Sequence, residues 1–316
     1  MRIRLYSVLV LIASLLSGCG YNQIQINEQA GITGEDTLYF VNFFLYAHEP
    51  RSVDAKVVPF ITWDEQNEYF SLLDDGWGRR DMWCEKRRAA GFSTCTLNKG
   101  LKEFLFTSGT QIGLISKDEA SVDNPDNSGS LMWKLDWQLK QLPPWMRPEV
   151  QRNVKLHTLF NPKMDSGFVG TAATANAFSG QRCTAVMLDE LGKWRRGPDR
   201  QVLNDLQHVT RCRIVGSSYF GRSGAFYETL KHNPHIRKFI FDWTHNFGCN
   251  RGLYVARGEQ AVPVDEANPL TEALINHHLR DTMYPPDQHG GEQPTVTLPA
   301  LFKALKARGF VIEGTT

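Results

Sequence analysis

The chain has 316 residues and a formal net charge of +1, with 41% hydrophobic and 22% charged residues. This composition excludes a disordered chain and predicts one large domain with attachments or two small domains. Near-neutrality gives no overall electrostatic argument for nucleic-acid binding, so a DNA contact must come from local basic clusters, each of which is alternatively a solvated surface. The clusters are Arg79-Arg80, Lys86-Arg87-Arg88 and Lys193 with Arg195-Arg196.

The N-terminus has the pattern of an export signal. Arg2 and Arg4 precede an apolar run, Leu5–Leu16, that is too short to span a bilayer comfortably. The run ends in Leu-Ser-Gly-Cys, a lipobox that predicts cleavage and acylation at Cys19. The alternative is a buried first strand or helix. The stretch GCGYNQIQ, which ends at Gln25, resembles the start of LemA-type membrane proteins.

The cysteines show neither a CxxC pair nor a His/Cys ligand spacing, so we expect no structural zinc site. Most are expected to be buried thiols of a reducing compartment, which conflicts with the export signal. A change of composition near residue 31 marks a junction. We therefore predict a leader (1–30), a main domain (31–260) and a C-terminal segment (261–316).

From residue 64 onward, helical and strand patterns alternate along the chain. The expected elements, in chain order, are a helix Asp64–Leu73, a strand Met82–Glu85, a helix Ser93–Phe106, a strand Ile112–Ser116, a helix Leu131–Leu142, strands Val154–Phe160, Gly167–Gly170 and Thr184–Leu188, a helix Pro198–Val209, and strands Arg213–Ser217 and Lys238–Trp243. Such alternation predicts an α/β fold, a mostly parallel sheet with helices on both faces. Ligands of these sheets lie beyond the carboxyl ends of the strands.

One expected strand ends in two acids, Asp189 and Glu190. In a nucleotide hydrolase, an Asp at this place holds Mg²⁺ and the following Glu orients and deprotonates the attacking water. The alternative is the acidic start of a helix.

Upstream, the complete P-loop pattern GxxxxGK[ST] is absent, but Glu85–Thr94 follows a strand and precedes a helix. Gly91 permits a tight turn, and Ser93 can contact Mg²⁺ and the β-phosphate. Phe92 stands at the lysine position, so the positive charge must come from Arg88, or from Arg87 or Lys86. Alternatively, the segment is a basic turn before an amphipathic helix.

A third strand ends in Ser217-Ser218, whose hydroxyls can sense the γ-phosphate. The order strand–basic loop–helix, strand–Asp–Glu, strand–Ser–Ser is typical of P-loop motors of the additional-strand type. These segments resemble successive blocks of phage terminase large subunits, and the similarity covers about residues 36 to 257. The blocks are EKRRAAGFSTCTL from Glu85, GLISKDEASVD from Gly113, LMWKLDWQLKQLPPWMRP from Leu131, Gly170–Glu190, and CRIVGSSYFGRSGAFY from Cys212.

The resemblance implies an ATPase motor that packages double-stranded DNA with portal and small-subunit partners, as a ring in the host cytoplasm. It implies ATP and Mg²⁺ as cofactors, with a variant Walker A loop and a Walker B strand. The implied site residues are Arg87, Arg88, Gly91, Ser93 and Thr94 around the phosphates, Gln66 with Phe60 near adenine, Asp189 and Ser93 at the metal, Glu190 as the base, and Ser217 and Ser218 in coupling.

Terminases of this kind carry a nuclease after the ATPase. The acids after residue 260 end no clear apolar strand, so we expect a truncated or residual ATPase portion without nuclease activity. A second hypothesis is a lipoprotein anchored to the membrane at Cys19, with a degenerate, non-catalytic domain; an acylated mature N-terminus would indicate it. A third is a helicase-like ATPase, which strand separation would indicate.

Overall fold

The computed structural model of the 316-residue chain describes residues 36–50, 56–87, 90–174, 178, 180–194, 198–219, 223–234, 236–242, 254–257 and 260–263. The lipobox cysteine Cys19 and the acids after residue 263 lie outside these residues. The chain divides into two compact units, Met1–Phe241 and Asp242–Thr316, and the boundaries near residues 30 and 260 remain predictions. Within the described part, no helix has the length and hydropathy needed to cross a bilayer.

An eight-stranded sheet is the centre of the first unit. From β10 to β7 all neighbouring strands run parallel, whereas β6 and β5 add an antiparallel edge. The order across the sheet is β10 (Arg237–Phe241), β3 (Met82–Lys86), β9 (Arg213–Ser217), β8 (Ala185–Asp189), β4 (Gln111–Ser116), β7 (Ser166–Ala172), β6 (Thr158–Asn161) and β5 (Gln151–Asn153).

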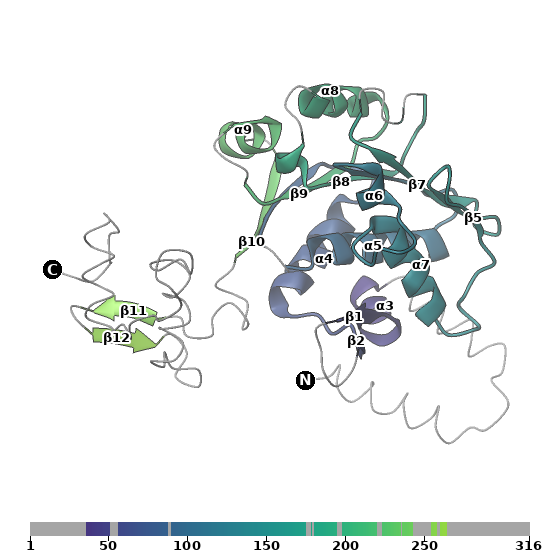
Figure 1. The fold of residues 1–316 in the computed structure, drawn as a ribbon, viewed down its shortest axis with the longest axis horizontal. Helices are drawn as coiled ribbons and strands as arrows, with labels where there is room; N and C mark the ends of the chain where they lie inside the picture. The colour runs from purple at the N-terminus through teal and green to yellow at the C-terminus, as the bar shows by residue number, and fades with distance from the viewer. Residues whose placement is uncertain are drawn as a thin grey trace, which may run out of the picture. The chain divides into compact units, whose positions relative to one another are not determined.

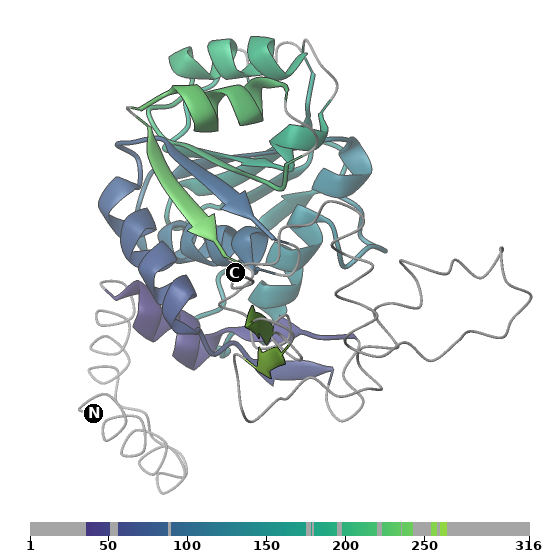
Figure 2. The same cartoon turned by 90° about the vertical axis from the view of Figure 1, so that its left-hand side faces the viewer.

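Helices cover both faces of this sheet (Figure 1). Side chains of β8 alternate between two cores: Ala185 and Met187 belong to one, and Val186 and Leu188 to the other. Burial on both faces explains why the strand is a continuous apolar run. The first core includes α4 (Asp64–Gly76), α5 (Phe92–Phe106) and α7 (Leu131–Gln141); the second includes α8 (Pro198–Asp205) and α9 (Ala225–His232). Figure 2 shows the strands between the two helical layers, and the predicted fold class is confirmed.

The region before the sheet forms elements that the sequence analysis left unassigned. Helix α3 (Thr37–Phe44) starts where the Asp36 carboxylate accepts a hydrogen bond from the backbone N–H of Tyr39. Strands β1 (Tyr46–His48) and β2 (Val57–Pro59) then form a separate antiparallel pair. Gln138 of α7 holds β1 by two hydrogen bonds, one from Tyr46 N (3.3 Å) and one to Tyr46 O (2.6 Å).

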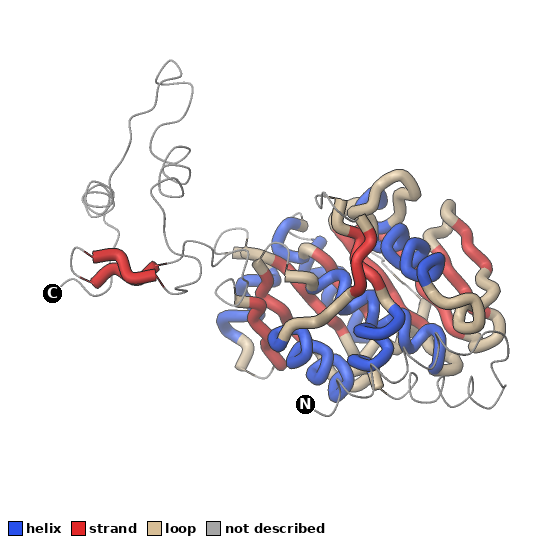
Figure 3. The backbone as a smooth tube through the Cα atoms, turned by 90° about the horizontal axis from the view of Figure 1, so that it is seen from below, coloured by secondary structure: helices blue, strands red, loops and turns tan. Residues whose placement is uncertain are grey.

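The predicted elements from α4 to β10 are present, with ends shifted by a few residues. Helix α7 ends at Gln141, ahead of the Pro143-Pro144 pair that stops it. The single strand expected at Val154–Phe160 is instead a tight β5–β6 hairpin, because a turn with a left-handed His157 interrupts it. In Figure 3 the strands of the sheet lie side by side with helices packed against them.

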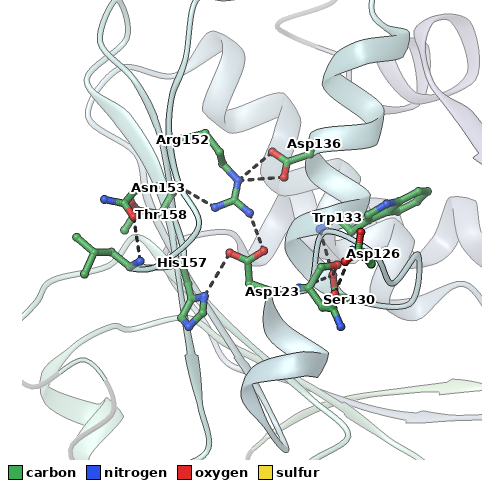
Figure 4. A network of polar contacts seen from close by, with 11 residues as sticks. Asp123, Asp126, Ser130, Trp133, Asp136, Arg152, Asn153, His157 and Thr158 are labelled. Carbon is green, nitrogen blue, oxygen red and sulfur yellow. Dashed lines mark hydrogen bonds and ion pairs between the residues drawn. The ribbon is translucent and has the colours of Figure 1, made fainter.

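A buried ionic network holds the β5–β6 hairpin to the helical layer (Figure 4). The Asp123 carboxylate, 1% exposed, accepts from Arg152 Nη2 at 2.7 Å and lies 3.2 Å from His157 Nδ1. Arg152 Nε also contacts both carboxylate oxygens of Asp136 on α7, at 3.1 and 3.0 Å. Asp123 directly follows α6 (Glu119–Val122), so the network connects α6, α7 and the hairpin.

The described cysteines Cys84, Cys95, Cys183 and Cys212 are free thiols, and all but Cys183 are buried. Burial raises the pKa of the Cys84 and Cys95 thiols well above the ordinary value. Because the thiolate is the reactive form, these two cysteines act as apolar core residues.

Candidate functional site

Three neighbouring strands bring the predicted motifs to one edge of the sheet. Strand β9 lies between β3 and β8, as expected for an additional-strand arrangement. The carboxyl ends of these strands carry Lys86, Asp189 and Ser217. A cleft of about 820 Å³ lies there, and the turn before α5, the start of α7 and the segment after β8 line it. Such a crevice is where sheets of this kind bind ligands.

Gly91 allows the chain to turn from β3 into α5. Its φ of 86° lies in the left-handed region, and a Cβ on it would stand 2.6 Å from Gln66 Nε2. No side chain caps the N-terminus of α5, and the cleft is lined there by Gly91, Ser93 and Thr94. The backbone N–H groups of this first turn are therefore suited to an anion.

Phe92, at the position of the usual P-loop lysine, is directed into the core. It is 1% exposed and packs so closely on β9 that a Cβ at Gly216 would meet its ring at 2.2 Å. The Lys86 ammonium lies 5.2 Å from the centre of that ring. The positive charge next to the turn thus comes from the end of β3.

Ser93 and Asp189, expected to share a magnesium ion, are in direct contact. Ser93 Oγ donates to Asp189 Oδ1 at 3.0 Å. The Lys86 ammonium contacts the same oxygen at 3.1 Å and Glu190 Oε1 at 3.2 Å, with 11% of the lysine side chain exposed. Burial acts to lower the pKa of Lys86, but the two carboxylates outweigh it and raise this pKa above its ordinary value.

Glu190 is held between two lysines. Its backbone is left-handed (φ 58°, ψ 34°), its Oε1 faces Lys86, and its Oε2 lies 2.9 Å from Lys193 Nζ. Burial alone would raise the pKa of this carboxyl, but Lys86 and Lys193 lower it below the ordinary value. Glu190 is therefore a carboxylate at neutral pH, as a base must be.

Ser217 connects β9 to the segment that carries Glu190. The buried Ser217 hydroxyl accepts from Gly192 N at 3.0 Å and donates to Ser218 O at 2.8 Å. A Cβ at Gly192 would stand 2.8 Å from Ser218 O, so the two segments are in close backbone contact. A shift at the end of β9 must therefore move the turn after Glu190.

Two further predicted residues have protein partners. Arg87 Nη1 forms an ion pair with Glu65 Oε2 at 3.0 Å, and both side chains are buried. Gln66 Nε2 donates to the Ala90 carbonyl at 3.3 Å, so Gln66 supports the turn, although it also lines the cleft. Arg88, the arginine expected to stabilise phosphate charge, lies outside the described residues.

Sequence reasoning missed part of the cleft wall. Lys193 could have been found from its spacing, three residues after Glu190. Lys134 of α7 and an aromatic group of His48, Trp133 and Trp137 also line the cleft, with ring centres 5.2 to 6.0 Å apart. These residues are distant from the motifs in sequence, and only the packing of α7 on α5 brings them to the site.

No group of three or more His, Cys, Asp or Glu side chains that could hold a metal is found in the described part of the chain. Mg²⁺ bound with a nucleotide needs only one or two carboxylates, because phosphates and water complete its shell. A serine hydroxyl and an aspartate oxygen 3.0 Å apart fit that requirement.

Replacing Gly91 by alanine is expected to destabilise the protein by about 1 kcal/mol more than Gly109→Ala. Both glycines have positive φ, 86° and 75°, so both variants carry the same kind of backbone strain, about 1–2 kcal/mol. Only at Gly91 must the new methyl displace Gln66 and break its hydrogen bond to Ala90, because nothing lies within 4 Å of a Cβ at Gly109. Denaturant unfolding measures both variants, and equal losses would contradict a Gly91–Gln66 contact.

Solved structures of phage large terminases resemble this chain. The bacteriophage HK97 large terminase aligns with a TM-score of 0.52 and 15% identity, over 80% of this chain and 52% of that chain. This chain shares its fold. The chain thus spans about half the length of the HK97 protein, 52%.

Two further matches are looser. The Thermus phage P74-26 large terminase ATPase domain aligns with a TM-score of 0.43 and 16% identity, over 57% of this chain and 81% of that one. The large terminase of another thermophilic bacteriophage, solved in complex with ADP, aligns at 0.45 and 11% identity, over 60% and 48%. No protein-family model and no curated protein matches the sequence.

Proposed function

We propose that this chain is an ATP-hydrolysing motor domain of the phage terminase large-subunit kind. The contact between Ser93 Oγ and Asp189 Oδ1, 3.0 Å, carries the proposal. It joins the start of α5 to the end of β8 across a strand inserted between β3 and β8. A glycine turn, a hydroxyl and an acid pair gathered at one sheet edge form the minimum of a site for Mg²⁺ and a triphosphate.

In this proposal, the first turn of α5 holds the phosphates by its backbone N–H groups, with Ser93 and Thr94 beside them. Ser93 and Asp189 hold Mg²⁺, which neutralises negative charge on the phosphate oxygens. The Lys86 ammonium, now on Asp189 and Glu190, turns toward the phosphates when the cation takes its place between the acids.

Glu190 acts as the base that orients and deprotonates the attacking water. Both of its oxygens have a lysine partner, Lys86 on Oε1 and Lys193 on Oε2. Movement of Lys86 to the nucleotide frees Oε1 for water, so the base becomes available only when the site is filled. Ser217, bonded to Gly192 N, passes the change at the phosphate from β9 to the rest of the sheet.

Double-stranded DNA as the translocated polymer, portal and small-subunit partners, a homo-oligomeric ring and the host cytoplasm as location belong to the same proposal. They rest on the sequence resemblance. The lipoprotein alternative depends on Cys19, outside the described residues, and no described residue favours it.

Calorimetric titration with ADP and a non-hydrolysable ATP analogue tests the proposal. We expect saturable binding that weakens by about tenfold or more when Mg²⁺ is chelated or when Ser93 is replaced by alanine, the cost of losing a ligand contact to a charged group. The matched control is Ser108→Ala, because Ser108 is exposed in a turn at the other end of α5. Absence of saturable binding in the unaltered protein would overturn the proposal.

A further inference from the structure

Lys134 is a cation on the cleft wall that the motifs do not include. It lies in the first turn of α7 and lines the same cleft as Gly91, Ser93 and Glu190. The end of β4, from which the chain reaches α7, neighbours β8 with its Asp189. Lys134 therefore approaches the site from the side of the sheet opposite to Lys86, whose strand β3 lies beyond β9.

The backbone of Lys134 is held firmly. The buried Ser130 caps α7, its Oγ accepting from Trp133 N at 3.3 Å, and Ser130 O accepts from Lys134 N. Leu131 and Leu135 on either side are 1% exposed in the core. A side chain on such a support can hold a ligand without a large loss of backbone entropy.

The ammonium of Lys134 has no ion-pair partner among the described residues, unlike the other two lysines of the cleft. Lys86 contacts Asp189 and Glu190, and Lys193 contacts Glu190. Burial lowers the pKa of Lys134, and the nearby Lys86 lowers it further, whereas Asp189 raises it. A partly buried cation beside an open cleft is unfavourable until an anion enters.

We infer that Lys134 binds an oxyanion of the nucleotide's di- or triphosphate and supplies, from α7, a positive charge that Phe92 cannot give. The inference rests on the proposed nucleotide site and adds a residue to it. Since Phe92 is buried against Gly216, the turn itself has no lysine to follow the terminal phosphate. Lys86 and Lys134 then contact the phosphates from two sides, which gives a site with selectivity for the longer polyphosphate chain.

The test compares Lys134→Met, Lys134→Arg and the control Lys140→Met, an exposed lysine near the other end of the same helix. Calorimetry measures binding of AMP, ADP and a non-hydrolysable ATP analogue with Mg²⁺. We expect Lys134→Met to weaken the analogue and ADP by about 10- to 100-fold, the range for losing one hydrogen bond to a charged group. AMP binding stays unchanged, Lys134→Arg restores most of the affinity, and Lys140→Met changes nothing.

A thermal melt without ligand separates binding from a structural role. Because Lys134→Met removes a buried charge that has no counter-ion, the melting temperature of the unliganded variant is expected to stay equal or rise. A lowered melting temperature, or equal loss of AMP and ATP-analogue affinity, would assign Lys134 to the fold and overturn the inference. Unchanged affinity of Lys134→Met for the analogue would overturn it while leaving the proposed function intact. If the unaltered protein binds no nucleotide, both fail.

Discussion

Replacing Glu190 by glutamine is expected to abolish ATP hydrolysis and to leave nucleotide binding largely in place. Glutamine keeps the size of the side chain but cannot accept a proton from water, and loss of a general base lowers kcat by about 10²- to 10⁴-fold. Lys86 and Lys193 lose a charge partner, while Asp189 still faces Lys86 and Ser93. The cation site therefore persists, and kcat falls without a matching loss of ADP affinity.

Phosphate release at saturating MgATP measures kcat, and an ADP titration measures the remaining site. The control is Glu119→Gln, because Glu119 is exposed at the start of α6. Its turnover should match that of the unaltered protein. Full hydrolysis in Glu190→Gln would show that another group deprotonates the water, and the assignment of the base would then be wrong.

Replacing Arg152 by alanine is expected to cause the largest loss of stability, about 3–5 kcal/mol, the range for removing one partner of a buried ion pair. Asp123 is 1% exposed and would retain only its contact to His157, 3.2 Å away. Asp136 would lose both of its contacts to Arg152 Nε. Figure 4 shows that Arg152 lies between these two carboxylates, so a single truncation leaves two acids without their cation.

Denaturant unfolding measures this loss, with Arg200→Ala as the matched control. Arg200 also pairs with a carboxylate, that of Glu228, but their side chains are 64% and 43% exposed. Exposed pairs contribute at most about 1 kcal/mol, since water screens the charges. Equal, small losses in the two variants would mean that water reaches Asp123 and that the network does not fix the hairpin to α7.

The sequence predicted the sheet well because each central strand is buried on both faces. The run before Asp189 is apolar at every position since alternate residues enter two different cores. The same reasoning located the carboxyl ends of β3, β8 and β9, because parallel strands end at one edge. Their order across the sheet came from the resemblance to a known motor layout.

Other features of the site depend on packing, which sequence patterns do not carry. Gln66 was expected near the base, yet it donates to the Ala90 carbonyl, because α4 packs beside the turn. Lys86 was one of three possible cations, and only the geometry shows it on both acids while Arg87 pairs with Glu65. Lys134 belongs to a helix that reaches the cleft through contacts with α5.

A crystal structure of the protein with Mg²⁺ and a non-hydrolysable ATP analogue tests the account most directly. We expect the β- and γ-phosphates at the first turn of α5, one Mg²⁺ within reach of Ser93 Oγ and Asp189, and the Lys86 ammonium displaced from between Asp189 and Glu190. A nucleotide bound elsewhere, or a cation that contacts neither Ser93 nor Asp189 directly or through water, would contradict it.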